Sequence, residues 1–100
     1  MTKIYDILTW LQQWFVSQCN EEWEHEYGIK IDTIDNPGWS VTIDLIGTDL
    51  ENGSMDTISI ERSEDNWINC SVVDKQFKGY GGPDQLEEIL NSFRAWIDQG

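Results

Sequence analysis

The clearest structural pattern in this chain lies in residues 27–45, YGIKIDTIDNPGWSVTIDL. Apolar and polar residues alternate on both sides of Asp35-Asn36-Pro37-Gly38, as expected for β-strands with one buried face. Within the interruption, Pro37 and Gly38 occupy the two central positions typical of a type II turn. The segment therefore predicts a β-hairpin.

The same alternation returns after a polar connection over residues 48–54. It predicts a third strand around Ile58–Ile60 and a fourth over Ile68–Val72, joined by a turn at 63–66. A short fifth strand is expected around Gln76–Tyr80. Strands joined in this way by turns favour an antiparallel meander.

Helical periodicity flanks the strands. Residues 3–19 carry an apolar stripe with Thr2 as a plausible N-cap, and residues 84–98 carry another after Pro83, which suits a first helical position. The first stripe is too wide for a single packing partner, so this helix is expected to contact both the sheet and the other helix. Its apolar positions are Ile4, Ile7, Leu8, Trp10, Leu11, Trp14, Phe15 and Cys19.

The order of these elements predicts a single α+β domain over residues 1–100. One antiparallel sheet of four to five strands in a meander should carry the N-terminal and C-terminal helices on one face. A hydrophobic content of 39% with six Trp is sufficient for a core. No secretion signal or membrane-spanning run is evident, so we expect a cytoplasmic protein.

Charge indicates the kind of partner. The chain has 19 Asp and Glu against 6 Lys and Arg, a formal net charge of -13. Such a field repels nucleic acid and anionic membranes and accelerates association with basic proteins. We therefore expect a monomer that binds a basic protein, and neither nucleic acid nor a membrane.

Two acidic surfaces are candidates for that contact, because alternate turns of a meander lie at the same end of the sheet. The favoured partner-binding set combines Glu21, Glu22, Trp23, Glu24 and Glu26 with Asp49 and Glu51. The alternative set at the opposite end is Asp35, Glu64, Asp65 and Trp67. In each set the Trp could anchor a partner, whereas the structural alternative is a core Trp beside solvated acids.

The sheet face away from the helices is also expected to be polar. Its predicted solvent-facing residues are Asp32, Thr42, Asp44, Ser59, Glu61, Asn69 and Ser71.

Residues for catalysis or metal binding are sparse. His25 is the only histidine, and its glutamate neighbours diverge from it on any regular backbone. Cys70 lies within a strand and faces the predicted core, whereas Cys19 ends a helix whose dipole disfavours a thiolate. We expect free thiols, no metal or cofactor, and no enzyme activity. A small sulfurtransferase would instead need a loop-presented cysteine of low pKa.

Four segments together resemble the bacterial immunity protein family 53. They are WEHEYGIKID at 23–32, NPGWSV at 36–41, ERSEDNW at 61–67 and GGP at 81–83. The resemblance implies a cytoplasmic antidote that binds the toxic domain of a polymorphic toxin, and the acidic charge is compatible with a nuclease toxin. The signature positions matched are Trp23, Glu24, Pro37, Gly38 and Trp39, of which the last three favour a structural role. An acidic housekeeping adaptor is the remaining alternative.

Overall fold

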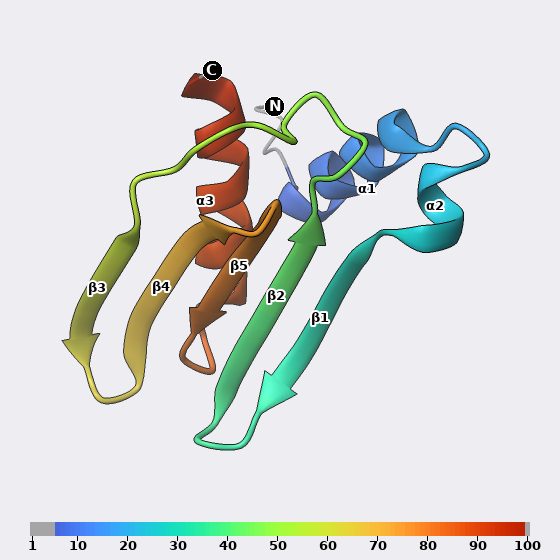
Figure 1. Cartoon of the computed structure of the whole chain (residues 1–100). Coiled ribbons are helices and arrows are strands. Elements are labelled where there is room, and N and C mark those ends of the chain that lie inside the picture. The colour runs from blue at the N-terminus through green and yellow to red at the C-terminus, as the bar shows by residue number, and fades with distance from the viewer. Residues whose placement is uncertain (1–5, 100) are drawn as a thin grey trace, which may run out of the picture.

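The computed structural model describes residues 6–99, which form one five-stranded antiparallel sheet with two long helices on one face (Figure 1). This arrangement confirms the predicted fold class. The elements in chain order are α1 (Ile7–Gln18), α2 (Trp23–Glu26), β1 (Ile29–Ile34), β2 (Gly38–Asp44), β3 (Ile58–Ser63), β4 (Asn66–Val73), β5 (Gln76–Gly81) and α3 (Leu86–Gln99).

The strand order is β1-β2-β5-β4-β3, which departs from a simple meander at one connection. The segment between β2 and β3 crosses to the far edge, so β5 pairs with β2 and lies between β2 and β4. The burial of the strands follows this order. Phe77 and Gly79 of β5 are buried, whereas β3 is exposed except at half-buried Ile58. A strand with so few buried residues suits a sheet edge.

The β1–β2 hairpin forms as predicted, but with a different turn. Asp35, Asn36 and Pro37 form the turn, and Gly38 already belongs to β2, where it pairs with Ile34. The type II turn with Gly38 at its third position is therefore wrong. Gly38 has a different function, because a Cβ at this position would collide with the backbone carbonyl of Gly81 on β5.

The helix boundaries differ from the predicted ones. Asp6 caps α1 by accepting a hydrogen bond from the Leu8 N–H at 3.0 Å, so the helix begins at Ile7 rather than at residue 3. The proposed cap, Thr2, lies outside the described residues. Helix α3 begins at Leu86, and Pro83 lies in the preceding turn rather than at the first helical position.

The core lies between the sheet and the two long helices. Phe93 of α3 is at its centre, with ring centroids 5.1 Å from Trp14 and 5.0 Å from Phe77. Helix α3 approaches the sheet closely because β5 has no side chain at Gly79, where a Cβ would collide with Ile89. Helix α1 completes the core with Ile7, Leu11 and Trp14. Among residues 6–99, no helix is both long and apolar enough to cross a membrane.

Candidate partner-binding surface

Four of the five glutamates of the favoured set lie in or immediately before the short helix α2, and they are here called the glutamate cluster (Glu21, Glu22, Glu24 and Glu26). Sequence periodicity did not predict α2, which is too short to show a helical repeat. Asn20 stabilises the start of α2, because its side-chain oxygen accepts hydrogen bonds from the N–H groups of Glu22 at 3.0 Å and Trp23 at 2.9 Å.

Glu24 has a structural function within this cluster. Its carboxylate accepts hydrogen bonds from the N–H groups of Asn20 at 2.9 Å and Glu21 at 2.8 Å. Hydrogen bonds from its own backbone and from these two residues lower the pKa of Glu24. They also hold Glu21 in the left-handed region, with φ 75°. Glu24 therefore stabilises the chain before α2, while Glu21, Glu22 and Glu26 are exposed.

Trp23 is a core residue. Its side chain is 3% exposed and contacts the rings of Trp14 and Phe15, with centroids 6.0 Å and 5.8 Å away. A buried indole cannot reach a partner without unfolding its surroundings. Its burial favours the structural alternative for Trp23 over a role as a partner anchor.

The β2–β3 connection does approach the glutamate cluster, as the topology suggested. Gly47, with φ 83°, lies against Trp23 and lines a hollow of about 500 Å³ together with residues 20–23 and 25–27. Asp49 and Glu51 belong to the same connection but do not line this hollow. Glu51 accepts a hydrogen bond from the Gly47 N–H at 3.0 Å and lies 3.6 Å from Lys75, and these contacts lower the pKa of Glu51.

The alternative set lies at the opposite end of the sheet. The β1–β2 and β3–β4 turns share this end (Figure 1), but β5 separates the two hairpins. Asn36 and Glu64 nevertheless line one hollow of about 580 Å³, whereas Asp35 and Asp65 are exposed outside it. We call it the Trp67 hollow; its lining residues are Asn36, Ser59, Ile60, Glu61, Glu64, Trp67, Ile68, Asn69 and Tyr80.

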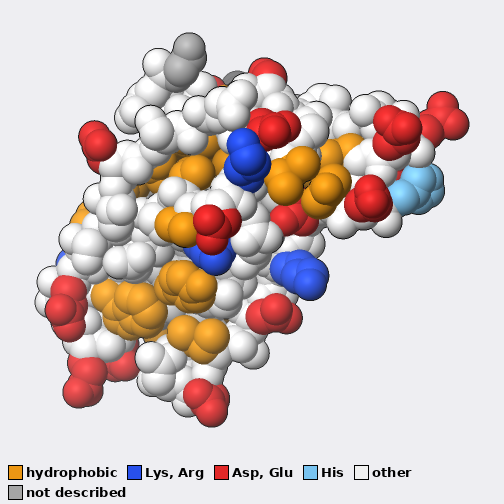
Figure 2. All heavy atoms as spheres, viewed as in Figure 1, with side chains coloured by type: hydrophobic (Ala, Val, Ile, Leu, Met, Phe, Trp, Pro, Cys, Tyr) orange, Lys and Arg blue, Asp and Glu red, His pale blue; other side chains and the backbone are white. Residues whose placement is uncertain are grey.

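The register of the sheet explains how these side chains meet. Glu61 on β3 is directly opposite Trp67 on β4, and Asn69 on β4 is directly opposite Tyr80 on β5. Cross-strand partners share a face, here the one opposite the two long helices. Figure 2 shows hydrophobic side chains gathered over the lower part of this face, with acidic side chains along its margins.

This open face matches the predicted one closely. The cross-strand pairing places all seven residues that were expected to face solvent on this face, and none of them is buried. Tyr80 was missed as a site residue. It is 36% exposed. The available signal was the alternation of the predicted fifth strand, which places Tyr80 on the same face as Lys78 and opposite to Phe77 and Gly79.

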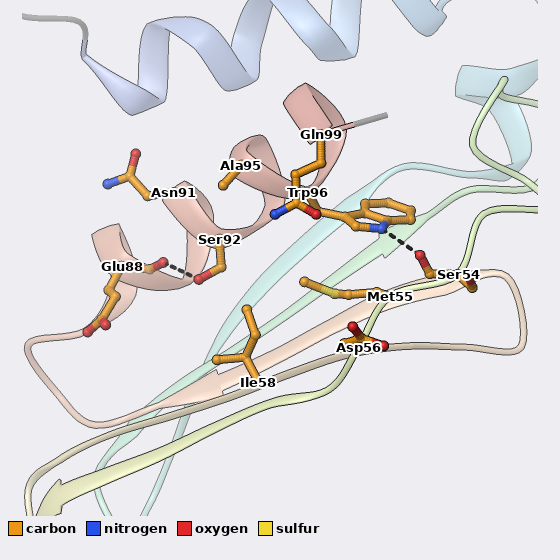
Figure 3. Close-up of a pocket in the computed structure, with 10 residues that line it drawn as sticks. All are labelled: Ser54, Met55, Asp56, Ile58, Glu88, Asn91, Ser92, Ala95, Trp96 and Gln99. Atoms are coloured by element: carbon orange, nitrogen blue, oxygen red, sulfur yellow. Dashed lines mark hydrogen bonds between the residues drawn. The ribbon is translucent and has the colours of Figure 1, made fainter.

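A third hollow, of about 640 Å³, lies between α3 and the segment that leads into β3 (Figure 3). Several of its polar groups are already paired. The Trp96 indole N–H donates to the Ser54 carbonyl at 2.8 Å, and the Ser92 hydroxyl donates to the Glu88 carbonyl at 3.0 Å. The Glu88 carboxylate is paired with Arg62, which lowers the pKa of Glu88. The Arg62–Glu88 pair attaches α3 to β3, the Trp96–Ser54 bond attaches it to the segment before β3, and the Ser92–Glu88 bond lies within the helix. These contacts present no nucleophile with a base.

The cysteines have environments that disfavour thiolate chemistry. Cys70 is fully buried, and burial raises the pKa of its thiol to about 11. Burial and the nearby charge of Glu24 raise the pKa of Cys19 as well. Both are free thiols. Within residues 6–99, no three His, Cys, Asp or Glu side chains gather closely enough to hold a metal ion.

Comparison with protein families finds one match that covers nearly the whole chain. Residues 8–98 match the family model described as Immunity protein 53. No curated protein and no solved structure matches the chain.

Proposed function

Because the chain belongs to the immunity protein 53 family, we propose that it is a cytoplasmic antidote that binds the toxic domain of its cognate polymorphic toxin one-to-one. The toxic domain is basic, as expected of a nuclease that binds phosphates. The antidote acts by occupying that basic surface and catalyses no reaction of its own.

The observation that carries this proposal is the excess of carboxylates left for a partner. The three ion pairs described within residues 6–99 occupy Glu88, Glu51 and Asp98. Most of the 19 Asp and Glu side chains are therefore available to an external cation. A surface of this kind accelerates encounter with a basic protein and excludes nucleic acid from the covered site.

The thiol environments support a non-catalytic function. A sulfurtransferase needs an accessible thiolate, and at neutral pH a thiol with the raised pKa of Cys70 is almost entirely protonated. Cys19 is half-buried, and its pKa is raised too.

Two surfaces compete for the toxin contact. The glutamate cluster offers exposed Glu22 and Glu26, but the neighbouring Trp23 is buried and Glu24 stabilises the turn before α2. The open sheet face offers Glu61 and Glu64 beside an accessible aromatic hollow. Binding hot spots are enriched in Trp and Tyr that a partner can desolvate, so the geometry favours the open face.

Co-purification with the product of the neighbouring gene tests the function. We expect a one-to-one complex whose association rate, measured by stopped-flow fluorescence, falls steeply as salt concentration rises. A complex that assembles at a salt-independent rate would contradict electrostatic steering. Failure of the wild-type chain to bind the neighbouring product would contradict the proposed function.

Paired charge reversals distinguish the two surfaces. Glu61→Lys with Glu64→Lys should slow association and weaken the complex more than Glu22→Lys with Glu26→Lys, although both pairs change net charge equally. Glu24 is left intact, because reversing its charge would disrupt the turn before α2. The opposite ranking would assign the contact to the glutamate cluster.

A further inference from the structure

The Trp67 hollow combines aromatic rings with carboxylates, which is the environment that suits a cationic side chain. We propose that it receives an arginine or lysine side chain projecting from the toxin domain. This inference rests on the proposed function and adds to it the recognition element, the chemical group recognised, and its position on the open face.

The aromatic part of the hollow comes from two adjacent strands. Trp67 of β4 is half-buried and Tyr80 of β5 is 36% exposed, so both present ring surface to solvent. They do not stack on each other, because neither ring belongs to any of the six ring pairs described within residues 6–99. Their exposed ring surface is therefore available to an incoming cation.

The acidic part of the hollow comes from β3 and the turn that follows it. Glu61 is directly opposite Trp67, and Glu64 lies in the β3–β4 turn at the rim. Both carboxylates are exposed, and neither takes part in an ion pair described within residues 6–99. An inserted side chain can therefore lay its apolar stem on the indole and place its charged head beside these acids.

No described Lys or Arg lines the hollow to compete with an incoming cation. Arg62 is the nearest in sequence, but its guanidinium bonds to the Glu88 carboxylate at 2.6 Å and 3.0 Å. Lys78 is the neighbour of Tyr80 on the open face and is opposite Ser71 and Thr42, but it does not line the hollow. The hollow is thus acidic and aromatic, which complements a basic partner rather than a second copy of this acidic chain.

The test uses a pair of short peptides that differ only in charge. Acetyl-Gly-Arg-Gly-amide and its citrulline counterpart are titrated into ¹⁵N-labelled protein, with the Trp67 indole N–H followed by NMR. We expect the arginine peptide to shift this resonance and those of Asn69 and Tyr80 saturably, and the neutral peptide to bind several-fold more weakly. Equal shifts from both peptides, or shifts confined to other surfaces, would overturn the assignment.

Matched variants identify the groups responsible. Trp67→Leu, and separately Glu61→Gln with Glu64→Gln, should each weaken binding of the arginine peptide several-fold. Glu87→Gln, at an exposed position of α3, and Val73→Thr, elsewhere on the open face, are controls that should leave peptide binding unchanged. If Trp67→Leu does not fold, the glutamine pair still decides the outcome, because exposed Glu→Gln changes preserve shape.

Binding to the toxin domain separates this inference from the proposed function. If the wild-type chain binds the toxin domain and the hollow variants bind it equally well, the inference fails while the function stands. If the hollow variants lose toxin affinity and the two controls retain it, both are supported. Dimerisation of the wild-type chain in analytical ultracentrifugation that Trp67→Leu abolishes would assign the hollow to a second copy and overturn the proposal.

Discussion

The backbone carbonyl of Gly81 occupies the space that a side chain on Gly38 would need. The two residues belong to β2 and β5, whose pairing joins the β1–β2 hairpin to the β3–β4–β5 meander. Gly38 thus acts at the junction of the two halves of the sheet, and its lack of a side chain permits that junction.

Replacing Gly38 with Ala should therefore destabilise the fold. The added Cβ must displace the backbone of β5, and we expect a loss of about 3 kcal/mol in the free energy of unfolding, measured by urea denaturation. Gly28→Ala is the matched control, because a Cβ there meets nothing within 4 Å. We expect it to change stability by less than about 0.5 kcal/mol. Equal stabilities of the two variants would disprove the collision.

Trp23 and Trp67 should behave in opposite ways when truncated. Trp23→Ala empties a core position and should cost about 3–5 kcal/mol of folding free energy. Trp67→Ala removes a half-buried side chain from the open face and should cost about 1 kcal/mol, while reducing affinity for the toxin domain. Thermal unfolding and calorimetric titration, done on both variants, measure the two effects. Lost affinity in a fully folded Trp67→Ala protein would support a contact between Trp67 and the toxin domain. Retained affinity would contradict that contact.

The buried thiol of Cys70 should make the fold sensitive to alkaline pH. Its pKa is raised from 9.0 to about 11 in the folded chain, so the folded state retains a proton that the unfolded state releases. This stabilisation is complete below pH 9 and is lost as pH rises toward 11, by roughly 2–3 kcal/mol. Urea unfolding at pH 8 and pH 11 should show a smaller decrease for Cys70→Ala than for the wild-type chain. Identical decreases would exclude Cys70 as the source.

The Glu24 carboxylate, which holds the turn before α2, should contribute to stability in the opposite pH range. Its pKa is lowered in the folded state, so its contribution is present above the unfolded pKa, near 4.5, and is lost as pH falls. Glu24→Gln should lower the Tm at neutral pH and flatten its fall between pH 5 and pH 3. Glu26→Gln, at an exposed neighbouring position, should reproduce the wild-type profile.

Local sequence patterns predicted most of the elements. Alternation over residues 27–45 located β1, β2 and their hairpin, and the same period identified the polar open face that carries Asn69 and Glu61. These predictions succeeded because side-chain direction within a strand follows from the backbone itself. The short helix α2 was missed because four residues cannot show a helical period.

The candidate site was only partly predictable for the same reason. The sequence shows that an aromatic residue has acidic neighbours, but it does not show whether other elements cover the ring. Trp23 and Trp67 have similar acidic surroundings in the sequence, yet α1 buries Trp23 through Trp14 and Phe15. None of the helices described within residues 6–99 covers the face of Trp67.

The sequence by itself determined the five strands, the two long helices, the polarity of each sheet face and the acidic charge, because these depend on periodicity and composition. Only the tertiary structure decided that β5 lies between β2 and β4, that Gly38 is required by Gly81, and that Trp67 rather than Trp23 is accessible. Those features arise from competition among distant segments for a limited buried surface. The core-facing side of β5 carries Phe77, Gly79 and Gly81, and the two glycines leave room for Ile89 of α3. This fit exists only when the strands and α3 are assembled.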